Sequence, residues 1–266
     1  MKTDSVKLMY FSPTGTTKAV AQSIAHGFHP ESLDVIDITK TDNRKQPLHI
    51  SDQEVLLVAV PVYMGRVPAL ATQWLKTLQA KDTPTVCVVV YGNRAYEDAL
   101  LELKNIVEKC GCIPVAYGAY IGEHSFSNPE EPVAQGRPDA QDLKHAEKFG
   151  QKIREKLLSL ASISEVADVE IPGVFPYRKD AKLWTVDFIA VNDTCVQCGT
   201  CAGVCPVDAI DPEDSRNIDQ EKCITCCACI KNCPQQARTI KPSPVKDAAK
   251  RLHTLCSEPK MPENYL

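Results

Sequence analysis

Residues 7–28 read KLMYFSPTGTTKAVAQSIAHGF and place three local structures in a row. KLMYF is a short apolar run typical of a buried strand, and AVAQSIAHGF carries the apolar periodicity of a helix. Between them lies SPTGTTK, a turn rich in hydroxyl side chains. This order favours an anion-binding cradle, because the N–H groups and the dipole at a helix N-terminus attract a phosphate.

The cradle matches neither common phosphate motif. It lacks the second glycine and the Lys-Ser/Thr pair of a P-loop, and no G-x-G-x-x-G occurs anywhere in the chain. Gly15 allows close approach of a phosphate, and the hydroxyl donors are Ser12, Thr14, Thr16 and Thr17. An ordinary N-cap that binds no ligand is the alternative interpretation of this stretch.

The pattern of strand and helix continues downstream. Further apolar runs occupy 33–38, 54–60, 85–91 and 113–121, and helical segments alternate with them at 16–27, 68–79, 97–110 and 138–160. Five buried strands alternating with helices predict an α/β fold with a doubly wound parallel five-stranded sheet. Ligands of such sheets bind beyond the carboxyl ends of the strands.

The loops at that edge give the region a resemblance to flavodoxin. SPTGTTK resembles the family's phosphate loop, while PVYMGRVP (61–68) and YGNRAYED (91–98) resemble its two flavin loops. The resemblance implies bound FMN, with Tyr96 flat against the flavin, Tyr63 or Met64 on its other side, and a Gly65 carbonyl near N5. The implied FMN-binding residues are Ser12, Thr14, Gly15, Thr16, Thr17, Tyr63, Met64, Gly65, Gly92, Asn93, Arg94 and Tyr96.

A second region is defined by cysteine. Nine of the 13 cysteines lie in 195–233, as two units that read CVQCGTCAGVCP (195–206) and CITCCACIKNCP (223–234). Both units are similar to the C-x2-C-x2-C-x3-C-P run of bacterial ferredoxins, in which the fourth cysteine ligates the other cluster. We therefore expect two [4Fe–4S] clusters, one held by Cys195, Cys198, Cys201 and Cys233, the other by Cys223, Cys226, Cys229 and Cys205. A pair of zinc sites is the alternative. Cys227 is surplus to both sets and is expected to pack beside a cluster.

These interpretations divide the chain into four parts. We expect a flavodoxin-like domain at 1–160, a linker at 161–186, a ferredoxin-like domain at 187–241 and a C-terminal tail helix within 242–266. In the linker, Phe175, Tyr177 and Trp184 are expected to anchor it by packing or to shield the gap between flavin and cluster. Together the two resemblances indicate the fused flavodoxin–ferredoxin proteins that occur mainly in anaerobes.

Composition excludes other classes of function. The formal charge is −4 and no basic stripe is present, which argues against binding to nucleic acid. No run of 18 apolar residues occurs, so no membrane span is expected. Thirteen cysteines without a signal-like N-terminus predict a cytoplasmic protein with metal or redox chemistry rather than disulfides.

The expected function is electron transfer between the two clusters and FMN, coupling one- and two-electron steps with a redox protein or a small-molecule donor or acceptor. The alternative is an FMN-dependent reductase of a small molecule. In that case His124, in the loop EHSFSNPEEPVAQGRPD (123–139), is the candidate proton donor beside the flavin. A redox sensor is a third interpretation, but the chain shows no output module.

Overall fold

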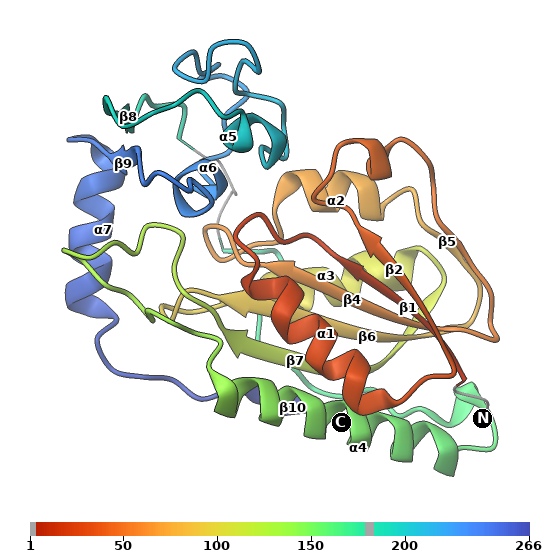
Figure 1. Cartoon of the computed structure of the whole chain (residues 1–266). Coiled ribbons are helices and arrows are strands. Elements are labelled where there is room, and N and C mark those ends of the chain that lie inside the picture. The colour runs from red at the N-terminus through yellow and green to blue at the C-terminus, as the bar shows by residue number, and fades with distance from the viewer. Residues whose placement is uncertain (1–3, 179–183) are drawn as a thin grey trace.

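The computed structural model describes residues 4–178 and 184–266. Its main element is a six-stranded sheet in the order β10-β7-β6-β4-β1-β2 (Figure 1). The strands are β1 Ser5–Tyr10, β2 Ser32–Asp37, β4 Val55–Pro61, β6 Thr83–Tyr91, β7 Cys112–Ile121 and β10 Glu263–Tyr265. All neighbours pair in parallel except β10, which is antiparallel to β7. The five predicted strands are thus confirmed, in the order of a flavodoxin-like sheet.

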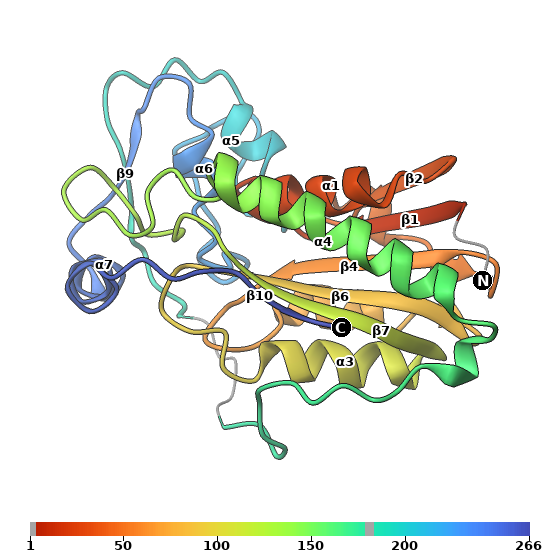
Figure 2. The same cartoon turned by 90° about the horizontal axis from the view of Figure 1, so that it is seen from below.

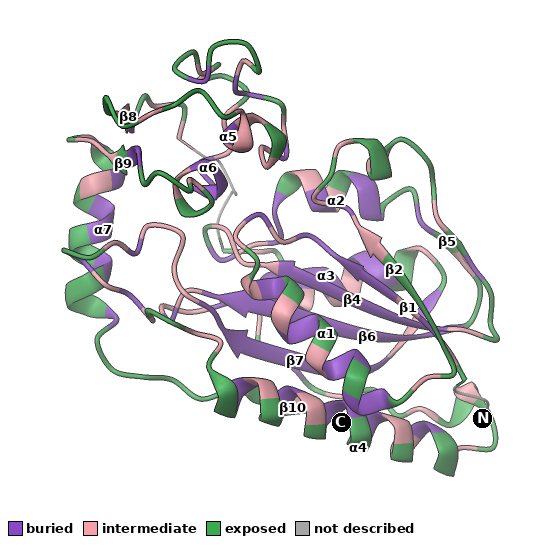
Figure 3. Cartoon of the chain, viewed as in Figure 1, coloured by how far each residue is buried: buried purple, intermediate pink, exposed green. Residues whose placement is uncertain are grey.

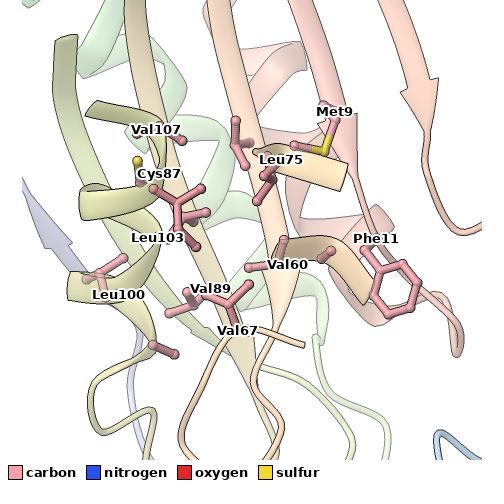
Figure 4. Close-up of a cluster of buried hydrophobic side chains, with 14 of the residues drawn as sticks. Met9, Phe11, Val60, Val67, Leu75, Cys87, Val89, Leu100, Leu103 and Val107 are labelled. Atoms are coloured by element: carbon pink, nitrogen blue, oxygen red, sulfur yellow. The ribbon is translucent and has the colours of Figure 1, made fainter. Parts of the chain in front are cut away.

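Helices cover both faces of this sheet, which explains why its central strands are apolar throughout. Figure 2 shows α1 (Thr16–Phe28) and α4 (Ala140–Ser159) on one face and α3 (Ala99–Lys109) on the other, where α2 (Ala69–Leu75) also packs. The strands β4 and β6 are buried along almost their whole length (Figure 3). Figure 4 shows the core beneath α2 and α3, where Leu75 and Leu103 pack against Val60 and Val89.

The helices α1 and α4 approach each other closely because each presents a glycine to the other. A Cβ on Gly27 would lie 1.8 Å from the Glu147 carbonyl oxygen, and one on Gly150 would lie 2.0 Å from that of Ile24. The predicted helical segments around both residues are confirmed. None of the helices in residues 4–178 and 184–266 is long and apolar enough to cross a bilayer.

The cysteine-rich segment forms a small unit over the carboxyl ends of the sheet (Figure 1). It contains the short helices α5 (Thr200–Gly203) and α6 (Ala228–Lys231), and a two-stranded sheet of β8 (Ile189–Val191) and β9 (Arg238–Ile240). The remaining short elements are β3 His49–Ile50, β5 Gln79–Ala80, η1 Asp42–Arg44 and η2 Ile163–Glu165.

The C-terminal segment does more than the predicted tail helix. The helix α7 spans Pro244–Leu255, and the chain then returns to the large sheet as β10. The Asn93 side chain holds this return, since its Nδ2 donates to the carbonyls of Cys256 and Glu258 and its Oδ1 accepts from the Lys260 N–H. The sixth strand was not predicted, and it ties the end of the cysteine-rich unit to the first domain.

The predicted linker, 161–186, contains residues 179–183, which lie outside the described residues. Tyr177 is a packing anchor as expected: the Arg66 guanidinium lies 4.2 Å from its ring centroid and Asn105 donates to its hydroxyl. Phe175 is not an anchor, because 71% of it is exposed. The backbone around these two residues is held instead by Asp98, whose carboxylate accepts from the N–H groups of Val174 and Arg178.

Candidate cofactor sites

A cavity with an empty volume of about 810 Å³ lies beyond the carboxyl ends of the strands. Its wall brings together several predicted flavin residues from three loops, together with the candidate acid: Thr14, Thr16, Thr17, Tyr63, Met64, Gly92 and His124. This is the place where a doubly wound sheet is expected to bind its ligand.

The phosphate cradle has an unsatisfied donor. Gly15 precedes α1 with φ +90° and has no side chain with which to cap the helix. The Thr17 hydroxyl is buried without a hydrogen-bond partner, although buried hydroxyls are normally paired. A phosphate in the cradle would supply the missing acceptor.

Ser12 and Gly15 lie in an adjacent cleft rather than on the cavity wall. The Ser12 Oγ accepts a hydrogen bond of 2.9 Å from the Lys18 N–H, and the Ser12 N–H donates to Thr39 Oγ1 at 2.7 Å. These bonds fix the shape of the loop, and direct contact of Ser12 with a phosphate stays a prediction.

The first flavin loop places two of its three candidates on the wall. Tyr63 and Arg66 exchange backbone hydrogen bonds, and Met64 between them adopts φ +55° and is 44% exposed. Gly65 is off the wall, and its carbonyl already accepts from the Asp98 N–H at 3.2 Å. Burial raises the pKa of Tyr63 well above its usual value, and the nearby thiols of Cys226 and Cys227 add to this effect.

The second flavin loop places one of its four candidates on the wall. Gly92 lines the cavity beside Tyr91, and the His124 ring lies against Gly92. Tyr96 is buried in the core against Tyr91, and its hydroxyl bonds to Glu263 and Tyr265 of the C-terminal strand. Asn93 holds the same C-terminal segment, and Arg94 pairs with Glu97. The structure therefore brings Asn93, Arg94 and Tyr96 to the returning chain and not to the flavin cavity.

His124 lies on the cavity wall as a neutral imidazole. Burial, with smaller contributions from Arg94 and Lys231, lowers its pKa to about 4. Its Nδ1 accepts from the Phe126 N–H at 3.0 Å, so Nε2 carries the hydrogen. Near neutral pH this side chain offers an N–H donor to the cavity and is not an imidazolium acid.

The two cysteine units repeat in structure as well as in sequence, with corresponding residues 28 positions apart. Left-handed backbone conformations recur at Gln197 and Thr225, and at Gly199 and Cys227. Each fourth cysteine accepts from the N–H group four residues later, Cys205 from Ala209 and Cys233 from Ala237, both at 3.3 Å. Because neighbouring N–H groups stabilise thiolate ligands, this geometry fits metal ligation.

Cys205, Cys223, Cys226 and Cys229, here the inner quartet, surround an apolar cavity of about 340 Å³. Burial raises the pKa of Cys226, and the thiols of Cys229, Cys205 and Cys223 raise it further. The four cysteines line one cavity, and Cys205 among them comes from the other unit; their joint ligation of a cluster stays a prediction. Cys227 lines the same cavity and is 2% exposed, which matches its expected packing role.

Cys195, Cys198, Cys201 and Cys233, here the outer quartet, include one exposed thiol, two half-buried thiols and the buried Cys201. Cys198 is exposed, and a hydrogen bond from Thr200 lowers its pKa. Across the described part of the chain, no three His, Cys, Asp or Glu side chains group tightly enough to hold a single metal ion. Each of the 13 cysteines is a free thiol.

Several residues of the cavity wall were not predicted as flavin contacts. Among them are Phe126, Ile224 and Thr225, and the last two lie between Cys223 and Cys226 of the inner quartet. Trp184 joins them, which agrees with its expected alternative role as a shield between flavin and cluster. Nothing local in the sequence marks Ile224 or Thr225 for this wall, because they reach it only when the two units dock.

The described residues fit both implied cofactors. The unpaired Thr17 hydroxyl at the start of α1 suits a phosphate, and the cavity beside it suits a flavin ring. The inner quartet encloses an apolar space with thiols from both units, which suits a [4Fe–4S] cluster.

Comparison with known families agrees with this division. A flavodoxin domain matches residues 7–110, and a 4Fe-4S dicluster domain matches residues 188–234. The chain therefore carries a flavodoxin domain followed by a 4Fe-4S dicluster domain, which is the composition of an iron–sulfur flavoprotein. The dicluster match favours [4Fe–4S] over the zinc alternative.

Curated relatives match over short stretches only. One component of the Na(+)-translocating ferredoxin:NAD(+) oxidoreductase complex of Acetobacterium woodii is 40% identical over 50 residues, which are 18% of this chain and 15% of that protein. The polyferredoxin-like component of an aliphatic sulfonate oxidoreductase of Pyrococcus furiosus is 41% identical over 57 residues, 20% of this chain and 33% of that protein. The matches thus span a third or less of these relatives.

Solved structures with a similar fold include several flavodoxins. One from the domain Archaea is 17% identical and covers 58% of this chain and 99% of that chain, with a TM-score of 0.42. The FMN-bound flavodoxin of Fusobacterium nucleatum is 16% identical and covers 59% of this chain and 99% of that chain, with a TM-score of 0.40. We draw no functional argument from similarities at this level.

Proposed function

We propose that this chain transfers electrons between two [4Fe–4S] clusters, one FMN and an external redox partner. When bound, the clusters carry one electron at a time and the flavin carries one or two. Their combination therefore couples one-electron transfer to two-electron transfer. The chain's own residues fix the order of the cofactors, shield them from water and give a partner access.

The observation that carries this proposal is the shared wall at Ile224. This residue lines both the large cavity and the apolar cavity of the inner quartet. Tyr63 of the first flavin loop lines the flavin cavity together with Ile224. A single layer of side chains therefore separates the two spaces, and the inner quartet is the one adjacent to the flavin cavity.

Of the two quartets, the outer one contains the thiol that is most accessible to an external partner. Cys198 is exposed, and its neighbour Val196 is 65% exposed. No thiol of the inner quartet is exposed: Cys226 and Cys229 are buried, as is Cys201 of the outer quartet, and Cys205 and Cys223 are half-buried. We propose that the external partner, a redox protein in a reducing cytoplasmic compartment, exchanges electrons at the outer quartet.

The test is flash photoreduction of the FMN in the anaerobic holoprotein, followed by visible absorbance. Electron transfer from flavin to cluster should then be intramolecular, with a rate independent of protein concentration. In Cys226→Ala, which removes an inner ligand, this phase should disappear while FMN stays bound. A rate proportional to protein concentration in the wild type would show that the cofactors of one chain do not exchange electrons directly.

One observation favours the alternative, an FMN-dependent reductase fed by the clusters. The N–H donor of neutral His124 lies on the cavity wall, where it suits orientation of a small molecule over the flavin. A redox titration separates the two functions. A flavin that takes two electrons in separate steps supports the carrier, and one that takes both together supports the reductase.

A further inference from the structure

One arginine occupies a core position of the cysteine-rich unit. The 28-residue repeat aligns Arg238 with Ile210, since each lies five residues after the fourth cysteine of its unit. Both side chains are buried, with Ile210 5% and Arg238 3% exposed. Ile210 lines the cavity of the inner quartet. By the symmetry of the repeat, Arg238 occupies the matching position beside the outer quartet.

The contacts of Arg238 agree with that placement. It shares a cleft with Cys233, the outer ligand supplied by its own unit. The Arg238 Nη2 donates to the Ser215 carbonyl, and the Ser215 N–H in turn donates to Gln197 Oε1 at 2.8 Å. Gln197 belongs to the outer ligand loop, so this chain of bonds fixes the guanidinium next to that loop.

The guanidinium is incompletely satisfied. Its Nη1 is buried without a hydrogen-bond partner, and no ion pair involves Arg238 among residues 4–178 and 184–266. A guanidinium keeps its charge at all ordinary pH values, and an unpaired buried charge is strongly unfavourable. A [4Fe–4S] cluster with four thiolates carries a charge of about −2 and offers sulfur acceptors. An anion of this kind supplies what the site lacks.

We propose that Arg238 donates N–H···S hydrogen bonds to the outer cluster and raises its reduction potential above that of the inner cluster. This inference rests on the two clusters proposed above. Hydrogen bonds to sulfur and positive charge both favour the reduced, more negative state of a cluster. Ile210, the counterpart of Arg238, offers neither to the inner cluster. An electron that enters the pair therefore resides mainly on the outer cluster, next to the accessible Cys198.

The test compares variants in an anaerobic titration followed by EPR. Arg238→Ile installs the residue that the repeat already accommodates at Ile210, and Arg238→Lys keeps the charge without the planar fork. At a fixed poise, the ratio of reduced to oxidised outer cluster in Arg238→Ile should fall at least about tenfold, equivalent to about 59 mV for a one-electron couple. The ratio in Arg238→Lys should fall less.

Arg216→Gln is the matched control. It removes one positive charge from the same unit, but at a side chain that is 51% exposed and pairs with Asp193. Its cluster potentials should stay at the wild-type values. Equal shifts in Arg216→Gln and Arg238→Ile would reduce the effect to net charge and overturn a specific role of Arg238.

A measurement on the wild-type protein covers the case in which Arg238→Ile fails to fold. Protein labelled with ¹⁵N-arginine and then reduced should show a ¹⁵N hyperfine coupling to a cluster, and this coupling should be lost in Arg238→Lys made with the same label. A reduced wild type without such coupling would overturn the proposal. Iron content distinguishes a failure of the two-cluster proposal from a failure of the role proposed for Arg238. Far fewer than about eight irons per chain would contradict the two clusters themselves, whereas full iron with unchanged potentials would contradict only the role of Arg238.

Discussion

Thr17→Val should weaken FMN binding and stabilise the protein without flavin. The buried Thr17 hydroxyl has no partner when the cradle holds no phosphate, and an unsatisfied buried hydroxyl costs about 1–3 kcal/mol. Valine removes that cost. With FMN bound, the same hydroxyl would donate to a charged phosphate, a hydrogen bond that contributes about 1.5–3 kcal/mol. The hydrogen bond alone should raise the dissociation constant of FMN about 10- to 150-fold in the variant, and the unsatisfied cost that valine removes from the flavin-free state adds to this rise.

The assay combines flavin fluorescence quenching with urea unfolding of flavin-free protein. Thr72→Val is the matched control, because Thr72 also has a buried hydroxyl without a partner but lies in α2, off the cavity wall. It should raise stability by a similar amount and leave FMN affinity unchanged. If Thr17→Val binds FMN as tightly as the wild type, the hydroxyl does not contact the phosphate. If it does not stabilise the flavin-free protein, the hydroxyl is not unsatisfied.

Three further changes have defined outcomes. Asn93→Ala removes the side chain that holds the C-terminal segment by three hydrogen bonds. It should lower the free energy of unfolding, measured in urea, by about 2–4 kcal/mol. A loss below about 1 kcal/mol would mean that other contacts hold this segment. His124 has a pKa of about 4 in the folded protein, below its unfolded value of about 6.5, so the unfolded state binds more protons between these pH values. The free energy of unfolding should therefore fall as the pH drops from 7 to 4, by at most about 3 kcal/mol. Urea unfolding at each pH measures this loss. His124→Gln should remove this part of the pH dependence, and an unchanged profile in the variant would assign it to other groups. Cys198→Ala should lose about half of the iron and keep FMN; loss of flavin with full iron would contradict the division into two cofactor units.

The large sheet could be predicted because buried parallel strands are continuous apolar runs, as β4 and β6 show. The strand β10 could not. It has only three residues and no apolar pattern, and it exists because the core residue Tyr96 and the Asn93 side chain provide its docking partners. The same docking of the C-terminal segment explains why Tyr96 lies against Glu263 and Tyr265 and off the cavity wall. Its spacing from Gly92 fits a flavin contact, but spacing within a loop does not reveal that a distant segment binds that side chain.

The cysteine ligands could be grouped because their spacing is local and their repeat is regular. The contact between the two cofactor sites could not, because Ile224 reaches the flavin cavity only through docking of the two units. Arg238 was also not among the predicted site residues. A single arginine in a charged segment looks like ordinary surface, and only the structural repeat shows that it occupies the buried position of Ile210.

The return of the chain to β10 has a consequence for biosynthesis. The strand that completes the large sheet follows both cysteine units in the sequence, so it leaves the ribosome after them. Domains generally fold as they emerge, N-terminal part first. The first domain can therefore form without its outermost strand and wait, with the edge of β7 uncovered, while the cysteine units are synthesised. Clusters have this interval for insertion, before β10 fastens the second unit over the flavin cavity.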